Sequence, residues 1–124
     1  MATIVAVGIG GAFGAIARYL ISGWIYNRWD GIFPLGTYLV NVLGSFILGF
    51  LVVYFNEKVM ISPAIKIMIT VGILGSFTTF STFSVETLKL IQLSMWKDAA
   101  LNLILSIVSG LFFAWLGAFL AAKS

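Results

Sequence analysis

The sequence predicts an all-helical membrane protein with four transmembrane helices, the third of them broken in mid-span. Of the 124 residues, 61% are hydrophobic and only 9% are charged, whereas about 25% of the residues of a soluble domain are charged. The apolar residues run around every side of the expected helices, which excludes a soluble four-helix bundle with polar outer faces. We therefore expect residues 1–124 to form one membrane-embedded domain.

The four spans are expected near residues 3–26, 34–54, 63–95 and 98–122, since about 20 helical residues cross the hydrocarbon core. No basic segment precedes the first apolar run, so we interpret it as a span and not as a cleaved signal. Pro34 and Pro63 stand at helix starts, where a missing backbone N–H costs no hydrogen bond. The third stretch is too long for one simple span, and a break near residues 75–79 accounts for its length.

Lysine and arginine are divided almost equally between the two sides of this arrangement. One side holds Lys58, Lys66 and Lys123, and the other holds Arg28 and Lys97 together with Arg18 and Lys89. The positive-inside rule therefore gives no strong orientation. Such a chain can insert both ways and pair as an antiparallel homodimer, although a few charges also give a weak bias by chance.

The chain contains no cysteine and no histidine. This excludes disulfides, zinc sites built on these residues, thiol nucleophiles and histidine general bases, so we do not expect an enzyme. Gly10 and Gly14 superficially resemble part of a nucleotide-binding motif. That motif needs a preceding strand, so we interpret them as a small-residue face for close helix packing.

The most informative segment is residues 75–84, which place six hydroxyls, three aromatic rings and a glycine inside an apolar stretch. Polar groups at membrane depth are costly unless they line a pathway or find partners. Phe80 and Phe83 share a helix face, and their positive ring edges, together with neighbouring hydroxyls, can hold a small bare anion. Plain aromatic packing is the alternative. The hydroxyl donors are Thr79, Ser81, Thr82 and Ser84.

Three further polar residues have two interpretations each. Asn41 alone favours an interhelical hydrogen bond, but beside the hydroxyl run it favours a donor that lines an anion path. Arg18 either extends its charge to the membrane surface or forms an electropositive vestibule. For Glu86 we favour a structural ion pair with Lys89 or Arg18 over proton exchange.

A break in the third helix also frees backbone carbonyl oxygens. These oxygens can hold a small hard cation, or they can bond to side chains and water. The spacing alone does not decide between the two.

Three runs of residues resemble the Fluc-type (CrcB) family of small fluoride channels. They are residues 14–18 (GAIAR), 36–41 (GTYLVN) and 72–86 (GILGSFTTFSTFSVE), and the resemblance extends over essentially the whole chain. It implies a dual-topology antiparallel homodimer in the bilayer of the cell membrane, with two fluoride pores and a central structural sodium ion. Its implied function is passive fluoride export, which lowers cytoplasmic fluoride.

The resemblance also assigns roles to residues of this chain. It places Asn41, Phe80 and Phe83 in the fluoride pore, Ser81, Thr82 and Ser84 on or beside a polar track, and Arg18 near the vestibule. It implies that the backbone carbonyls of Gly75 and Thr78 hold sodium.

The fourth span departs from the family pattern. Family members often have a pore serine where this chain has Gly110, while Ser109 lies one position earlier and Ser106 one turn earlier. We take Ser106 as the expected pore residue. Whether Asn102 faces the pore or a partner subunit stays open.

Two other function classes compete with a channel. Small multidrug exporters are similar in size, but they carry a glutamate in the first span, and this first span has none. A structural subunit of a larger complex would explain the glycines but not the hydroxyl run. No nucleic acid partner is expected. A Phe80→Ile substitution separates these classes, because it should abolish anion conduction in a channel but leave a scaffold assembled.

Overall fold

The computed structural model describes residues 1–124 and consists only of helices and short joints. Three unbroken helices are α1 (Ala2–Tyr26), α2 (Leu35–Glu57) and α6 (Trp96–Lys123). The third crossing is composite: α3 (Pro63–Ile67), η1 (Met68–Ile73), α4 (Leu74–Phe77) and α5 (Phe80–Gln92). All four crossings are long and apolar enough to span a membrane, which confirms the predicted four-span helical protein.

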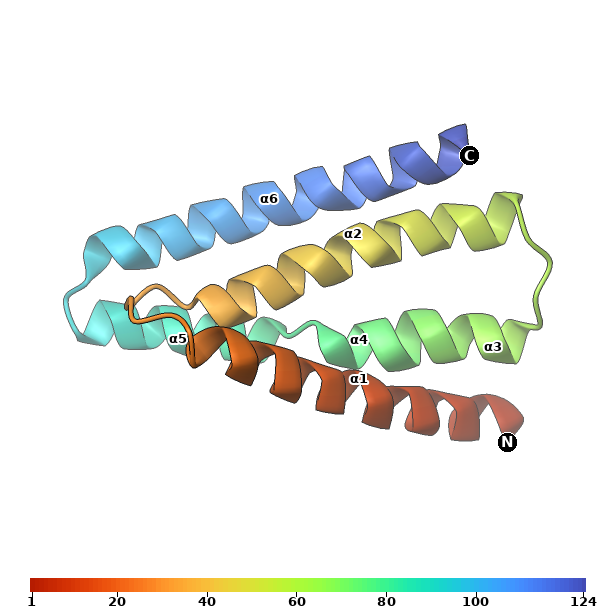
Figure 1. Ribbon diagram of the computed structural model, residues 1–124, viewed down its shortest axis with the longest axis horizontal. Helices are drawn as coiled ribbons and strands as arrows, with labels where there is room; N and C mark the ends of the chain where they lie inside the picture. Colours follow the sequence, from red (N-terminus) through yellow and green to blue (C-terminus); the bar gives the residue numbers. More distant parts are fainter.

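The crossings run alternately up and down, so both termini lie at one end of the bundle (Figure 1). The α1–α2 loop and the α5–α6 joint lie at the other end. This joint lies about three residues earlier than we expected, because α5 ends at Gln92 and α6 begins at Trp96. The chain reverses at Ser94, whose φ of 59° lies in the left-handed region, and Met95 N–H closes the turn on the carbonyl of Leu90 at 2.8 Å.

Gly10 and Gly14 pack α1 directly against the third crossing. Both are buried. A Cβ at Gly10 would collide with the carbonyl oxygen of Met68, and a Cβ at Gly14 with the carbonyl oxygen of Ile73 and the hydroxyl of Ser76. Small residues let helix backbones approach closely where lipid supplies no hydrophobic drive. The predicted packing role of these two glycines is confirmed.

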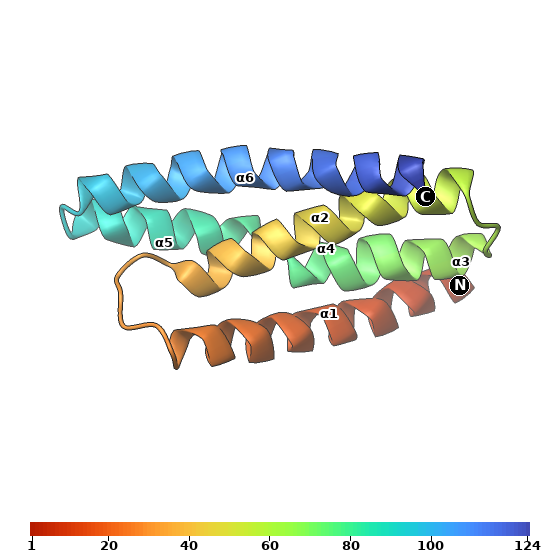
Figure 2. The same ribbon diagram turned by 45° about the horizontal axis from the view of Figure 1, so that its top comes forward.

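The most extensive helix contact joins α2 and α6, which lie side by side in both ribbon views (Figures 1 and 2). Glycines again set the distance. A Cβ at Gly49 would meet the carbonyl of Ala114, and one at Gly117 would meet the carbonyl of Phe46. Gly10 and Gly14 therefore let α1 pack closely against the third crossing, and Gly49 and Gly117 do the same for α2 and α6.

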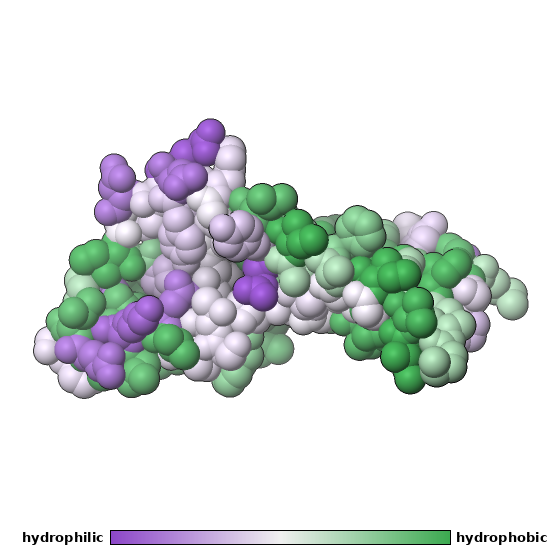
Figure 3. All heavy atoms as spheres, turned by 90° about the horizontal axis from the view of Figure 1, so that it is seen from below, coloured by the Kyte–Doolittle hydropathy of each residue, from purple (hydrophilic) through white to green (hydrophobic).

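Most large apolar side chains face outward, and only 17 of the 124 residues are buried. In the view from below, hydrophilic atoms gather toward the end that carries the α1–α2 loop, while apolar atoms cover much of the opposite half (Figure 3). An outward apolar surface of this kind is the normal state of a protein whose solvent is lipid.

We expect Gly14→Val to destabilise the fold by about 1–3 kcal/mol, because the added methyl groups overfill the α1 contact. The backbone carbonyl of Ile73 cannot move aside as a side chain would. Gly8→Val is the matched control, since a Cβ there meets nothing within 4 Å. Thermal unfolding of the purified protein in detergent tests this. Equal unfolding midpoints for both variants would contradict the packing role.

Candidate functional site

The third crossing is interrupted by two extended residues, Thr78 and Thr79. Thr78 has φ −85° and ψ 155°, and Thr79 has φ −148° and ψ 117°. The side chain of Thr79 then starts α5 by accepting a hydrogen bond from the N–H of Thr82 at 3.2 Å, as threonine does at helix N-caps. The break lies within the predicted range of residues 75–79.

Asn41 of α2 pairs with the peptide groups of Thr79 at this break. Its Oδ1 accepts from the Thr79 N–H at 2.8 Å, and its Nδ2 donates to the Thr79 carbonyl at 3.1 Å. The N–H has lost its helical partner at the break, and the amide replaces it. Asn41 is thus an interhelical hydrogen-bonding residue. Its Nδ2 carries a second hydrogen that makes no bond within the chain, so it also keeps one free donor.

A cavity of about 300 Å³ opens beside the break. It brings together several residues that the sequence singled out, from α2, α5 and α6, and no charged side chain lines it. The lining residues are Asn41, Gly44, Ser45, Leu48, Thr78, Thr79, Phe80, Phe83, Ser106 and Ile107. The cavity therefore offers amide, hydroxyl and aromatic groups, but no fixed charge.

The two phenylalanines of α5 lie 5.8 Å apart between ring centroids, at an interplanar angle of 51°. Phe83 is only 8% exposed, whereas Phe80 is 79% exposed at the surface of the bundle. Phe83 is thus part of the packed wall of the cavity. Phe80 projects from its rim.

Other predicted site residues lie away from this cavity. Ser81 and Thr82 line a separate hollow with Val85, Glu86 and Lys89. The hydroxyl of Ser84 donates to the carbonyl of Phe80 in its own helix, at 2.9 Å. The three hydroxyls of the expected polar track therefore do not converge with Asn41 and Phe83 within one chain.

Arg18 bonds to the third crossing next to the break. Its Nε donates to the carbonyl of Ser76 at 3.1 Å. This bond links α1 to the last turn of α4, directly before the break. The terminal nitrogens of the guanidinium make no hydrogen bond in the chain and stay available to an anion.

The carbonyls of Gly75 and Thr78 both lose their regular helical partners. In a continuous helix they would accept from the N–H groups of Thr79 and Thr82. Those groups instead donate to Asn41 Oδ1 and to the side chain of Thr79. Two neutral oxygens freed at one turn are a donor set that suits a hard alkali cation.

Glu86 corrects one expectation. It forms no ion pair with Lys89 or Arg18; its Oε2 accepts from the Tyr26 hydroxyl at 2.9 Å, and its Oε1 is buried without a partner. The same Tyr26 oxygen accepts from the N–H of Thr37, at 3.2 Å. The ring of Tyr26 packs over Gly36, so the end of α1 holds Glu86 beside the start of α2. Tyr26 was not predicted as a site residue, because in the sequence it marks only the end of the first span.

The fourth span contributes a hydroxyl to the cavity through Ser106. Ser109 bonds to the Tyr38 hydroxyl at 2.7 Å and does not line the cavity. A Cβ at Gly110 would lie 3.9 Å from the hydroxyl of Ser45. Ser45 was also missed, although it lies one turn after Asn41 on the same face of α2 and could have been found by that spacing.

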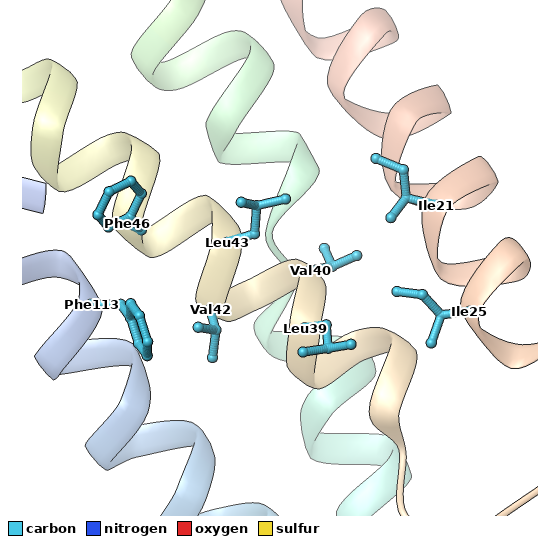
Figure 4. Close-up of a pocket in the computed structure, with 8 residues that line it drawn as sticks. All are labelled: Ile21, Ile25, Leu39, Val40, Val42, Leu43, Phe46 and Phe113. Carbon is cyan, nitrogen blue, oxygen red and sulfur yellow. The ribbon is translucent and has the colours of Figure 1, made fainter. Parts of the chain in front are cut away.

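A larger cavity of about 410 Å³ lies elsewhere, between α1, α2 and α6. All eight lining residues are apolar; Ile21 and Ile25 of α1 point toward α2, and Phe113 comes from the α6 side (Figure 4). With no hydrogen-bond donor, this cavity offers nothing to an ion. The polar cavity at the break is the candidate site.

Known proteins resemble this chain over nearly its full length. The family model described as "CrcB-like protein, Camphor Resistance (CrcB)" matches residues 5–118. A protein of a Nitratiruptor species is 53% identical over 105 residues, covering 85% of this chain and 80% of the relative. One of Magnetococcus marinus is 48% identical over 111 residues, 90% of each chain. One of Geotalea daltonii is 39% identical over 117 residues, 94% of each chain.

All three relatives are named "Fluoride-specific ion channel FluC". This chain belongs to the CrcB-like protein family.

Proposed function

We propose that this protein is a fluoride-selective ion channel that exports fluoride passively across the cell membrane and so lowers cytoplasmic fluoride. The observation that carries the proposal is the uncharged polar cavity at the helix break, lined by Asn41, Phe80, Phe83 and Ser106. The names of relatives that are 39–53% identical support the choice of fluoride. The protein catalyses no reaction.

The cavity binds the anion through dipoles. The free Nδ2 hydrogen of Asn41 and the hydroxyl of Ser106 are donors, and the ring edges of Phe80 and Phe83 carry partial positive charge. A binding site that lacks a lysine or arginine holds an anion loosely enough to release it, as conduction requires. A small anion is bound most strongly, because the interaction of an ion with a dipole strengthens as the two approach.

The pathway continues beyond the cavity. Arg18 beside the break attracts anions to a vestibule. Ser81, Thr82 and Ser84 form the polar track toward the α5–α6 end, and the hollow that Ser81 and Thr82 line with Lys89 supports this route. Glu86 marks the far limit of the track.

The working form is an antiparallel homodimer with two pores. Ser81 is exposed beside the polar break, where lipid offers no hydrogen-bond partner, and a second copy related by a twofold axis covers this face. The near balance of lysine and arginine between the two ends allows insertion in both orientations. The dimer therefore contains the polar tracks of both chains.

The carbonyls of Gly75 and Thr78 would hold a structural sodium ion at the dimer axis. The N–H groups that would bond to these carbonyls in a continuous helix donate elsewhere, which supports this assignment. The twofold axis doubles the two carbonyl oxygens of each chain, which gives a coordination set suited to an alkali ion. A bound sodium ion would supply positive charge that offsets the dipoles of these carbonyls.

The substitution Asn41→Asp tests the pathway directly. The carboxylate removes the donor to the Thr79 carbonyl and repels anions from the cavity, so we expect fluoride release from liposomes to fall by at least about 100-fold. The measurement is fluoride-electrode efflux from liposomes that contain the purified protein, with chloride release recorded in parallel.

Asn56→Asp is the matched control, because Asn56 lies outside the cavity and accepts a bond from Lys66 at 3.3 Å. It should release fluoride as the unaltered protein does. Release by the Asn41→Asp variant at the unaltered rate would contradict the pathway. A folded but silent unaltered protein would contradict the channel.

Sodium binding predicts cation-dependent stability. A ligand that binds only the folded dimer raises its stability by mass action, by about 2.7 kcal/mol at 100 times its Kd. Thermal unfolding in sodium, compared with N-methylglucamine of equal ionic strength, should show a higher midpoint in sodium. Identical midpoints in both salts would argue against the sodium site.

A further inference from the structure

Asn102 of α6 is the most deeply buried polar side chain in the protein. It is 1% exposed, lies outside the lining of the cavity, and bonds to α5. Burial of a primary amide is tolerated when its hydrogen-bonding groups are paired. Its partners show which residues it holds together.

A chain of three hydrogen bonds runs through Asn102. The hydroxyl of Ser106 donates to Asn102 Oδ1 at 3.2 Å, and Asn102 Nδ2 donates to the hydroxyl of Thr87 at 2.8 Å. Thr87 in turn donates to the carbonyl of Phe83, also at 2.8 Å. The chain begins at one residue that lines the polar cavity and ends at another, Phe83.

This connectivity distinguishes Asn102 from an ordinary buried amide. Thr87 is itself 5% exposed, so water does not compete for these bonds. Ser106 and Phe83 belong to different helices, and the hydrogen bonds that connect their positions pass through Asn102 and Thr87. Low local dielectric strengthens such a chain, and its members act as a unit.

We propose that Asn102 is a positioning residue of the ion pathway, which fixes the Ser106 hydroxyl at the cavity wall. The inference rests on the proposed function, because it concerns transport through that cavity. Asn102 Oδ1 holds the Ser106 proton while no anion is near. An arriving anion competes with Oδ1 for that proton, so Asn102 holds the hydroxyl in place until the anion replaces this bond.

Thr87 offers a matched pair of variants that leave Asn102 and the cavity lining unaltered. Thr87→Val keeps the shape and removes the hydroxyl that anchors Asn102. Thr87→Ser keeps the hydroxyl and removes a methyl group. We expect fluoride efflux from liposomes to fall about fivefold in Thr87→Val, the ratio given by one net hydrogen bond, and to be largely restored in Thr87→Ser.

The decisive readout is a double-mutant cycle with Ser106→Ala, which removes the hydroxyl that Asn102 positions. If Asn102 acts through Ser106, then Thr87→Val lowers efflux in the unaltered background and adds nothing in the Ser106→Ala background. A purely structural defect lowers efflux by the same factor in both. Size-exclusion profiles and unfolding midpoints verify that all variants are folded.

If Thr87→Val does not yield folded protein, Asn102→Ala takes its place in the same cycle with the same expectation. Equal losses in both backgrounds, or a variant as active as the unaltered protein, would overturn the inference. The unaltered protein distinguishes this failure from a failure of the proposed function. If it releases no fluoride, the channel and this inference fail together; if it does, only the inference fails.

Discussion

The pairing of the Asn41 amide with the peptide groups of Thr79 is the interaction on which the rest of the site depends. A helix broken at membrane depth exposes N–H and carbonyl groups that lipid cannot satisfy, and each costs several kcal/mol. Two hydrogen bonds, of 2.8 and 3.1 Å, supply partners from α2. They also keep Thr79 N–H away from the Gly75 carbonyl, so one side chain stabilises the break and frees the carbonyl beside it.

Close packing brings α2 and α1 to the break. Gly44, less than one turn after Asn41, leaves room for the methyl group of Thr78. On the other side, Gly14 lets Ser76 reach α1, where the Ser76 hydroxyl oxygen lies 2.9 Å from the carbonyl oxygen of Gly11. Arg18 adds its own bond to the Ser76 carbonyl. The broken crossing is thus held from both sides, by α1 and by α2.

Composition and spacing were sufficient to predict the four spans, the break and the glycine contact, since these follow from hydropathy, helix length and small-residue pattern. They were not sufficient for contacts made across the bundle. The bond between Tyr26 and Glu86 joins residues 60 positions apart, so spacing along one helix favoured a pair with Lys89 instead. The role of Asn102 stayed open in the sequence, because its partner Thr87 lies on another helix. Ser81 and Thr82 face a different hollow from Asn41, which no pattern within one helix could indicate.

The central claim is that an uncharged, dipole-lined cavity at the break selects fluoride. The measurement that tests it most directly is the reversal potential of the unaltered protein in a planar bilayer, with fluoride on one side and chloride on the other at equal concentration. We expect a reversal potential displaced far toward the fluoride equilibrium potential, because larger anions approach the amide and ring dipoles less closely. A reversal potential near zero would mean that both anions pass equally, and it would contradict the account.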